Sequence, residues 1–166
     1  MFQLSDIFTE PLYIAIAIGV VFILFVIIKR AGKMPYVACD ALLTKSELHF
    51  YRTLKQAIPV GTLICMKVRM GDLITCSDAQ WRSGWGPRVS AKHIDFVLID
   101  AQTTAIKLAI ELDDSTHRTN ADRIARDKFV NKAFSTAGVP LLRVNTSRQY
   151  DIADIRSQIN QSNALD

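Results

Sequence analysis

An uninterrupted apolar run near the N-terminus is the feature that most constrains what this chain can fold into. Leu12 to Ile28 (LYIAIAIGVVFILFVII) holds 17 residues without a charged or strongly polar side chain. As a helix rising about 1.5 Å per residue, the run would span roughly 25 Å, near the lower limit for crossing a bilayer. Lys29 and Arg30 follow and can extend to one headgroup layer, and Tyr13 suits the other. We therefore expect a transmembrane helix over residues 12–28.

A buried core helix and a cleaved signal peptide are the two alternatives for such a run. The pattern of a core helix is usually interrupted by polar positions, and nothing interrupts this run. A signal peptide has a basic leader and a small-residue cleavage site, whereas here the leader MFQLSDIFTE is acidic and KRAGK follows the run. The pattern therefore favours a retained membrane anchor.

The charges on either side of the run predict its orientation. Asp6 and Glu10 precede it without any Lys or Arg, whereas Lys29, Arg30 and Lys33 follow it. Because positive residues flanking a span stay on the cytoplasmic side, we expect the short N-terminus outside and the bulk of the chain in the cytoplasm, at the inner (cytoplasmic) membrane.

The chain after the run divides into a linker and one domain. We expect a short extracytoplasmic segment over residues 1–11, a basic juxtamembrane linker over 29–41, and an α/β domain with its own core over 42–166. The whole chain has a net charge of +4, but without its first 28 residues it holds 20 basic and 14 acidic residues, a net charge of +6. This excess favours an anionic partner, either nucleic acid or the inner membrane surface.

Periodicity and turn residues predict the order of elements in that domain. The expected helices are 44–58, 120–137 and 151–161, and the expected strands are 63–70, 73–76, 92–100, 105–113 and 139–144. Thr44 and Glu47 form the T-x-x-E pattern that begins a helix. The Gly-, Ser- and Trp-rich segment 77–90 is predicted as a loop.

Alternation along two of these strands predicts a pair of neighbouring carboxylates. In strand 105–113 the even-numbered positions are apolar, and Glu111 and Asp113 point to the other face. If the hairpin turn is centred on Thr103, Asp95 lies opposite Glu111, whereas a slip of one residue would separate them. Two such carboxylates raise each other's pKa, and a divalent cation removes that cost. Oxygen ligands in an incomplete cage suit Mg²⁺.

The order of these residues resembles the PD-(D/E)XK nuclease superfamily, with Asp95 followed by a hydrophobic stretch and then Glu111-Leu112-Asp113. Within it, Leu42 to Val144 resembles the DUF2726 family in the segments LLTKSELHFYRTL, HIDFVLID, AIELDDSTH, RDKFVNKAF and GVPLLRV. The acidic strand, the nearby His and the final strand are also similar to very-short-patch-repair endonucleases. The resemblance implies a restriction-endonuclease-like core, a mixed central sheet flanked by helices.

The resemblance also implies roles for individual residues. Asp95 and Glu111 match the metal-binding acids, and the main-chain carbonyl of Leu112 matches a third ligand. The implied cofactor is Mg²⁺ or Mn²⁺. Glu47 matches an acid that this superfamily often places on its first helix. The sequence leaves a second role open for Glu47, that of the capping partner of Thr44.

One position departs from the superfamily pattern. The lysine expected two residues after the glutamate is Asp113 here. Such a lysine orients the attacking water and offsets developing negative charge. Its charge could come from Lys92, Lys107 or Lys128, or His117 could act as general base or acid. The departure leaves open a migrated catalytic group or a domain that binds nucleic acid without cutting it.

Several of these residues also have ordinary structural interpretations. Asp113 can solvate a strand end, His117 can be a satisfied loop histidine, and Lys128 can belong to a solvated helix face. The basic-aromatic segment with Trp81, Trp85, Arg82 and Arg88 can stack bases or bind phosphates, cover the core, or anchor to lipid.

Two functions are consistent with the sequence. The first is a membrane-anchored, Mg²⁺-dependent nuclease that hydrolyses phosphodiester bonds of DNA at the cytoplasmic face. In it Asp95 and Glu111 hold the metal, with Glu47 and Asp113 as candidates for further metal ligands, and His117 or a lysine handles the proton. The second is a catalytically inactive nuclease-fold module that binds DNA or assembles with a membrane protein complex. A surface that only binds anionic lipid is a third possibility.

Overall fold

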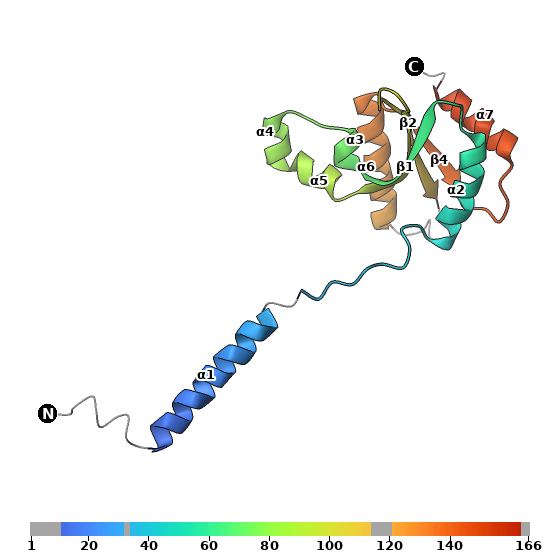
Figure 1. Cartoon of the computed structure of the whole chain (residues 1–166). Helices are drawn as coiled ribbons and strands as arrows, with labels where there is room; N and C mark the ends of the chain where they lie inside the picture. The colour runs from blue at the N-terminus through green and yellow to red at the C-terminus, as the bar shows by residue number, and fades with distance from the viewer. Residues whose placement is uncertain (1–10, 32–33, 114–120, 164–166) are drawn as a thin grey trace. The chain divides into compact units, whose positions relative to one another are not determined.

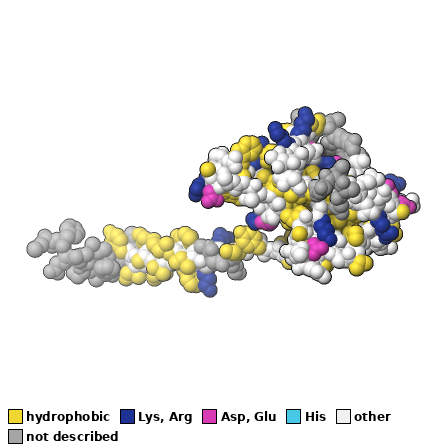
Figure 2. All heavy atoms as spheres, turned by 90° about the horizontal axis from the view of Figure 1, so that it is seen from above, with side chains coloured by type: hydrophobic (Ala, Val, Ile, Leu, Met, Phe, Trp, Pro, Cys, Tyr) yellow, Lys and Arg dark blue, Asp and Glu magenta, His cyan; other side chains and the backbone are white. Residues whose placement is uncertain are grey.

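The computed structural model describes residues 11–31, 34–113 and 121–163, which belong to two compact units, Met1–Asp40 and Ala41–Asp166 (Figure 1). In the first unit the described residues include one helix, α1 (Pro11–Ala31). Its segment Tyr13–Arg30 is long and apolar enough to cross a membrane, and none of it is buried. The side chains along α1 are nearly all hydrophobic (Figure 2). The predicted apolar helix is therefore present.

The second unit is built on a four-stranded mixed sheet. Its strands are β1 (Thr62–Arg69), β2 (His93–Asp100), β3 (Ile106–Asp113) and β4 (Leu141–Asn145). They lie in the order β1-β2-β3-β4, with the first two pairs antiparallel and β3 parallel to β4. The predicted mixed α/β architecture is confirmed at this level.

Helices cover both faces of the sheet (Figure 1). One face packs against α2 (Lys45–Ala57) and α7 (Ile152–Asn163), through a core that includes Phe50, Phe96 and Ile159. The other face packs against α6 (Ala121–Ala137) and the segment between β1 and β2, through a core that includes Met70, Val97 and Phe134.

The alternation predicted for the third of these strands is confirmed. Leu108 and Ile110 belong to the core beneath α2 and α7, and Ala109 belongs to the core beneath α6. The acids at odd-numbered positions therefore lie on the α6 side. Helix α6 connects the parallel strands β3 and β4, so it runs back along the sheet from the C-terminal end of β3 to the N-terminal end of β4. The first turns of α6 therefore lie near the C-terminal end of β3.

The segment between β1 and β2 is where the sequence prediction was wrong. The expected strand 73–76 is replaced by a short helix, α3 (Met70–Leu73), and an extended stretch, because Leu73 and Ile74 pack into the core rather than pairing with a strand. The expected loop 77–90 forms three helical turns, α4 (Asp78–Gln80), η2 (Trp81–Trp85) and α5 (Gly86–Ser90).

Local signals explain these turns. Ser77 and Gln80 form a capping box, a second example of the S/T-x-x-E/Q pattern. Gly84, with φ +106°, bends the segment, and a Cβ on Gly86 would overlap the indole of Trp81. The Ser77–Gln80 spacing was visible in the sequence and would have indicated the first helical turn.

Candidate functional site

A pocket of about 520 Å³ opens at the C-terminal end of β3. Elements α2, β2, β3 and α6 all contribute to its wall. The lining residues are Glu47, Asp95, Glu111, Leu112, Asp113, Ile124, Arg126, Asp127, Lys128 and Asn131. The structure thus brings together six of the predicted site residues, namely Glu47, Asp95, Glu111, Leu112, Asp113 and Lys128.

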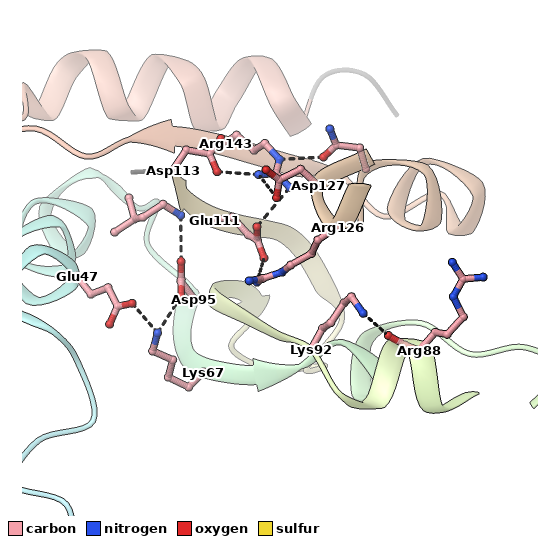
Figure 3. A network of polar contacts seen from close by, with 12 residues as sticks. Glu47, Lys67, Arg88, Lys92, Asp95, Glu111, Asp113, Arg126, Asp127 and Arg143 are labelled. Carbon is pink, nitrogen blue, oxygen red and sulfur yellow. Dashed lines mark hydrogen bonds and ion pairs between the residues drawn. The ribbon is translucent and has the colours of Figure 1, made fainter. Parts of the chain in front are cut away.

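Strands β2 and β3 separate at this pocket. Their ladder ends at the pair Phe96–Ile110, so Asp95 and Glu111 are the next positions along the two strands. The backbone amide of Leu112 donates instead to Oδ2 of Asp95 at 3.1 Å (Figure 3). The side chain of Asp95 therefore accepts the hydrogen bond that a backbone carbonyl of β2 would otherwise accept from Leu112. Asp95 and Glu111 lie opposite each other in the register that the sequence predicted.

Lys67, which sequence reasoning missed, joins two of the acids. Its Nζ donates to Oδ1 of Asp95 at 2.8 Å and to Oε1 of Glu47 at 2.6 Å (Figure 3). Burial lowers the pKa of Lys67, but the hydrogen bonds to Asp95 and Glu47 outweigh burial and hold that pKa above its usual value. The position of this lysine inside the otherwise largely apolar predicted strand 63–70 could have indicated that it has a partner within the fold.

The backbone of Lys67 is itself unusual. Lys67 has φ +54° in the middle of β1, a conformation that non-glycine residues seldom adopt. Its neighbours Met66 and Val68 pair with Phe96 and Ile94, so Lys67 stands across from Asp95 at a gap in the ladder. A strained backbone held by the surrounding sheet is a recurrent feature of functional sites.

Glu47 has the capping role that the sequence allowed, and its side chain also contacts Lys67. Oε2 accepts from the backbone amide of Thr44 at 2.9 Å, which completes the capping box, while Oε1 binds Lys67. Burial favours the neutral acid, but the hydrogen bonds from Lys67 and Thr44 hold the pKa of Glu47 below its usual value. Glu47 is therefore ionised and linked to Asp95 through one shared cation.

Glu111 is the most deeply buried acid of the site, with 6% of the residue exposed. Oε2 lies 3.3 Å from Arg143 and Oε1 lies 4.0 Å from Arg126, neither with hydrogen-bond geometry. Burial raises the pKa of Glu111; the two arginines oppose the rise, and Asp95 and Asp113 add to it. The negative charge of Glu111 is therefore only partly compensated by the protein.

Arg143 of β4 is a second residue that sequence reasoning missed. Its guanidinium lies 2.7 Å from Asp113 and 3.5 Å from Asp127, and its Nε donates to Asn131 at 2.8 Å (Figure 3). Asp113, which stands where the sequence resemblance predicted a lysine, is thus neutralised by an arginine from the neighbouring strand. Because β3 and β4 are 30 residues apart at this contact, only their pairing reveals it.

The remaining candidates for the missing positive charge are placed differently. Lys128 lines the pocket, whereas Lys107 forms an ion pair with Asp100 at 2.9 Å, at the hairpin end of β2. Lys92 donates to the backbone carbonyl of Arg88 at 2.8 Å and lines an adjoining pocket. His117 lies outside the described residues.

The donor set at the pocket suits a hydrated divalent cation. Among the described residues no three His, Cys, Asp or Glu side chains are grouped closely enough to enclose a metal ion. Mg²⁺ keeps several waters and is usually bound through one or two carboxylates. Asp95 and Glu111 line the same pocket, and the buried, under-compensated carboxylate of Glu111 would gain from a divalent charge.

Comparison with protein families gives one match. A family model described as a protein of unknown function (DUF2726) matches residues 39–162, which cover the linker end and nearly all of the folded unit. No curated protein and no solved structure matches the chain.

Proposed function

The chain belongs to the DUF2726 family, and we propose that it is a membrane-anchored, divalent-metal-dependent nuclease that hydrolyses DNA at the cytoplasmic face. We assign its folded unit to the PD-(D/E)XK superfamily, with a restriction-endonuclease-like core, on the order of its acidic strand motifs. One observation carries the proposal: Asp95 and Glu111, from adjacent strands, line one pocket with cations beside them.

In this proposal Asp95 and Glu111 hold Mg²⁺ or Mn²⁺, with the carbonyl of Leu112 as a further oxygen donor. When bound, the metal supplies an activated water and stabilises charge on the phosphodiester. Lys67 orients Asp95 through its 2.8 Å contact and adds positive charge beside the acids. Lys67 is thus our candidate for the charge that Asp113 does not provide.

Other residues position these groups or meet the substrate. Arg143 holds Asp113 and stands beside Glu111, which fixes the acidic strand end. Arg126 and Lys128 line the pocket on α6 and favour a phosphate there. The proton on the leaving oxygen is assigned to His117 or a lysine, the two candidates that the sequence offered.

A cleavage assay tests the proposal. The full chain in a neutral detergent is incubated with labelled single- and double-stranded DNA in Mg²⁺ or Mn²⁺. Asp95→Asn and Glu111→Gln are expected to lower the rate by about 100-fold or more, the scale of removing a group that stabilises the transition state. Asp154→Asn, an exposed change on α7, is the matched control and leaves the rate unchanged. Equal rates in all variants would contradict the assignment, and an inactive wild type across metals and substrates would contradict catalysis.

A second function is favoured by a specific observation, since Asp95 and Asp113 each already have a cation of the protein within 3 Å. A domain whose acids are neutralised internally can bind DNA or a membrane protein complex without cutting. This inactive module would bind DNA with an affinity that falls steeply as salt rises and without a metal. Calorimetric Mg²⁺ binding that Glu111→Ala abolishes would count against it.

The membrane part of the proposal is based on α1. Its two basic residues, Lys29 and Arg30, lie in its last turn. Because cytoplasmic flanks carry the positive charges, we propose that the N-terminus lies outside and the folded unit in the cytoplasm, with α1 as a single-pass anchor in the inner membrane.

A further inference from the structure

A second pocket, of about 640 Å³, adjoins the acidic one. The two share Asp95 and Arg126 as wall residues. Apart from these, the second pocket is lined by Lys67, Arg88, Ala91, Lys92, His93, Ala125 and Phe129. Its wall is thus strongly basic, whereas that of the first is rich in carboxylates.

The cations of this pocket are held close together by the protein. The guanidinium carbon of Arg88 lies 4.5 Å from the centroid of the Phe129 ring, and Nζ of Lys92 lies 5.0 Å from the same centroid. Lys92 also donates to the backbone carbonyl of Arg88 at 2.8 Å (Figure 3). Contacts with the ring and the carbonyl therefore fix the two cations before any ligand arrives.

The carboxylates of the described residues compensate the charges of Arg88, Lys92 and Arg126 only weakly. Among the residues that the structure describes, neither Arg88 nor Lys92 forms an ion pair with a carboxylate, and Arg126 reaches only Glu111, at 4.0 Å. Burial lowers the pKa of Lys92, and the positive charges of Arg126 and Arg88 lower it further. An anion in the pocket would relieve this repulsion.

We infer that Arg88, Lys92 and Arg126 form a binding site for a phosphodiester group of the DNA strand, next to the phosphate that is cut. The inference rests on the proposed function, because the wall shared through Asp95 and Arg126 is what joins this site to the acids. Two adjoining pockets, one for the reacting phosphate and one for a neighbouring phosphate, would fix the register of the strand. Because each pocket would hold one phosphate, the substrate would be a DNA strand with at least two phosphates.

Binding without turnover tests the inference separately from catalysis. The full chain in dodecyl maltoside with EDTA is titrated into fluorescein-labelled 12-nucleotide single-stranded DNA and its duplex, and anisotropy is measured. Arg88→Gln and Lys92→Gln are expected to weaken binding at least fivefold and to reduce the slope of log affinity against log salt by roughly one. Arg88→Lys keeps the charge and retains most of the affinity.

Arg52→Gln is the matched control, because Arg52 is an exposed cation on α2, across the sheet from the pocket. It is expected to change the affinity less than twofold. Losses in Arg88→Gln and Lys92→Gln no larger than in this control would overturn the inference. It would equally be overturned if these variants lost affinity for soluble short-chain phosphatidylglycerol, measured by thermal shift, and kept their affinity for DNA.

The outcomes separate the two proposals. If the wild type binds DNA through these residues but cuts nothing, the phosphate site stands and the nuclease assignment fails. If the wild type cuts DNA and the variants bind and cut like it, the nuclease assignment stands and the phosphate site fails.

Discussion

Lys67 and Asp95 lie 28 residues apart in the sequence, yet Nζ of Lys67 is 2.8 Å from Oδ1 of Asp95. Glu47, on a different element, binds the same ammonium at 2.6 Å. The shared cation keeps Asp95 oriented toward the backbone amide of Leu112, at the point where β2 and β3 separate. The shape of the acidic pocket therefore depends on a residue of β1.

Replacing Lys67 should reveal its backbone strain. Lys67→Ala and Lys67→Gly both leave Asp95 and Glu47 without their cation, so both lower the melting temperature. Because Lys67 has φ +54°, Lys67→Gly should be the more stable of the two by about 1 kcal/mol, or roughly 4 °C. This order is the reverse of that expected in an ordinary strand. Thermal unfolding of the full chain in detergent measures it, and a more stable alanine variant would contradict the strain.

Glu111→Gln should stabilise the protein at neutral pH. Because the folded state raises the pKa of Glu111 above 4.5, the native form binds the proton more tightly, and stability falls as pH rises through the folded pKa. Glutamine resembles the neutral acid and removes this cost, which corresponds to a few degrees in melting temperature for about 1 kcal/mol. The gain should vanish below about pH 4.5, and a gain independent of pH would refute this cause.

The same variant provides a test of metal binding that needs no cleavage. A ligand that binds only the native state raises the melting temperature, so Mg²⁺ or Mn²⁺ should stabilise the wild type. Glu111→Gln should lose that response, whereas Asp154→Asn, away from the pocket, should keep it. Equal metal responses in all three proteins would remove Glu111 from the metal site.

Glu47→Gln should separate the two roles of Glu47. Glutamine at this position still completes a capping box but loses the charge that binds Lys67. Because the folded pKa of Glu47 is depressed, its charge stabilises the protein above about pH 4.5, and this contribution is lost as pH falls through the folded pKa. We expect Glu47→Gln to cost about 1–2 kcal/mol at pH 7 and little in acid.

Thr44→Ala is the comparison for that experiment. It removes the side chain that accepts from the amide of Glu47 and should cost about 1 kcal/mol. Since a hydroxyl does not titrate, this cost should stay nearly constant across the same pH range. Parallel pH profiles of the two variants would mean that Glu47 acts through the cap alone.

Cysteine labelling should report the orientation of α1. Cys39 is an exposed, free thiol that follows the basic end of the helix. A membrane-impermeant maleimide should label it only after spheroplasts are lysed, as a cytoplasmic location requires. Ser5→Cys, in a chain that also carries Cys39→Ser, should be labelled in intact spheroplasts. The opposite pattern would place the folded unit outside.

The opposition of Asp95 and Glu111 was predictable because each step toward it is local. Strand alternation places Glu111 on one face, and the short hairpin connection limits the register to a few choices. Lys67 and Arg143 were not predictable in the same way, since their contacts depend on which strands become neighbours of β2 and β3. The Ser77–Gln80 capping pattern indicated the first helical turn within 77–90, but the Gly- and Trp-rich composition of this segment led to the prediction of a loop.

The sequence by itself determined the apolar helix, the order of helices and strands outside the segment between β1 and β2, and the face on which the acids lie. These features follow from backbone periods of 3.6 and 2 residues, which act over a few neighbouring positions. Only the tertiary structure decided that Lys67 joins Asp95 to Glu47, that Arg143 neutralises Asp113, and that Glu111 is desolvated. Ion pairs and desolvation depend on groups brought together from distant parts of the chain, and no local period encodes which groups those are.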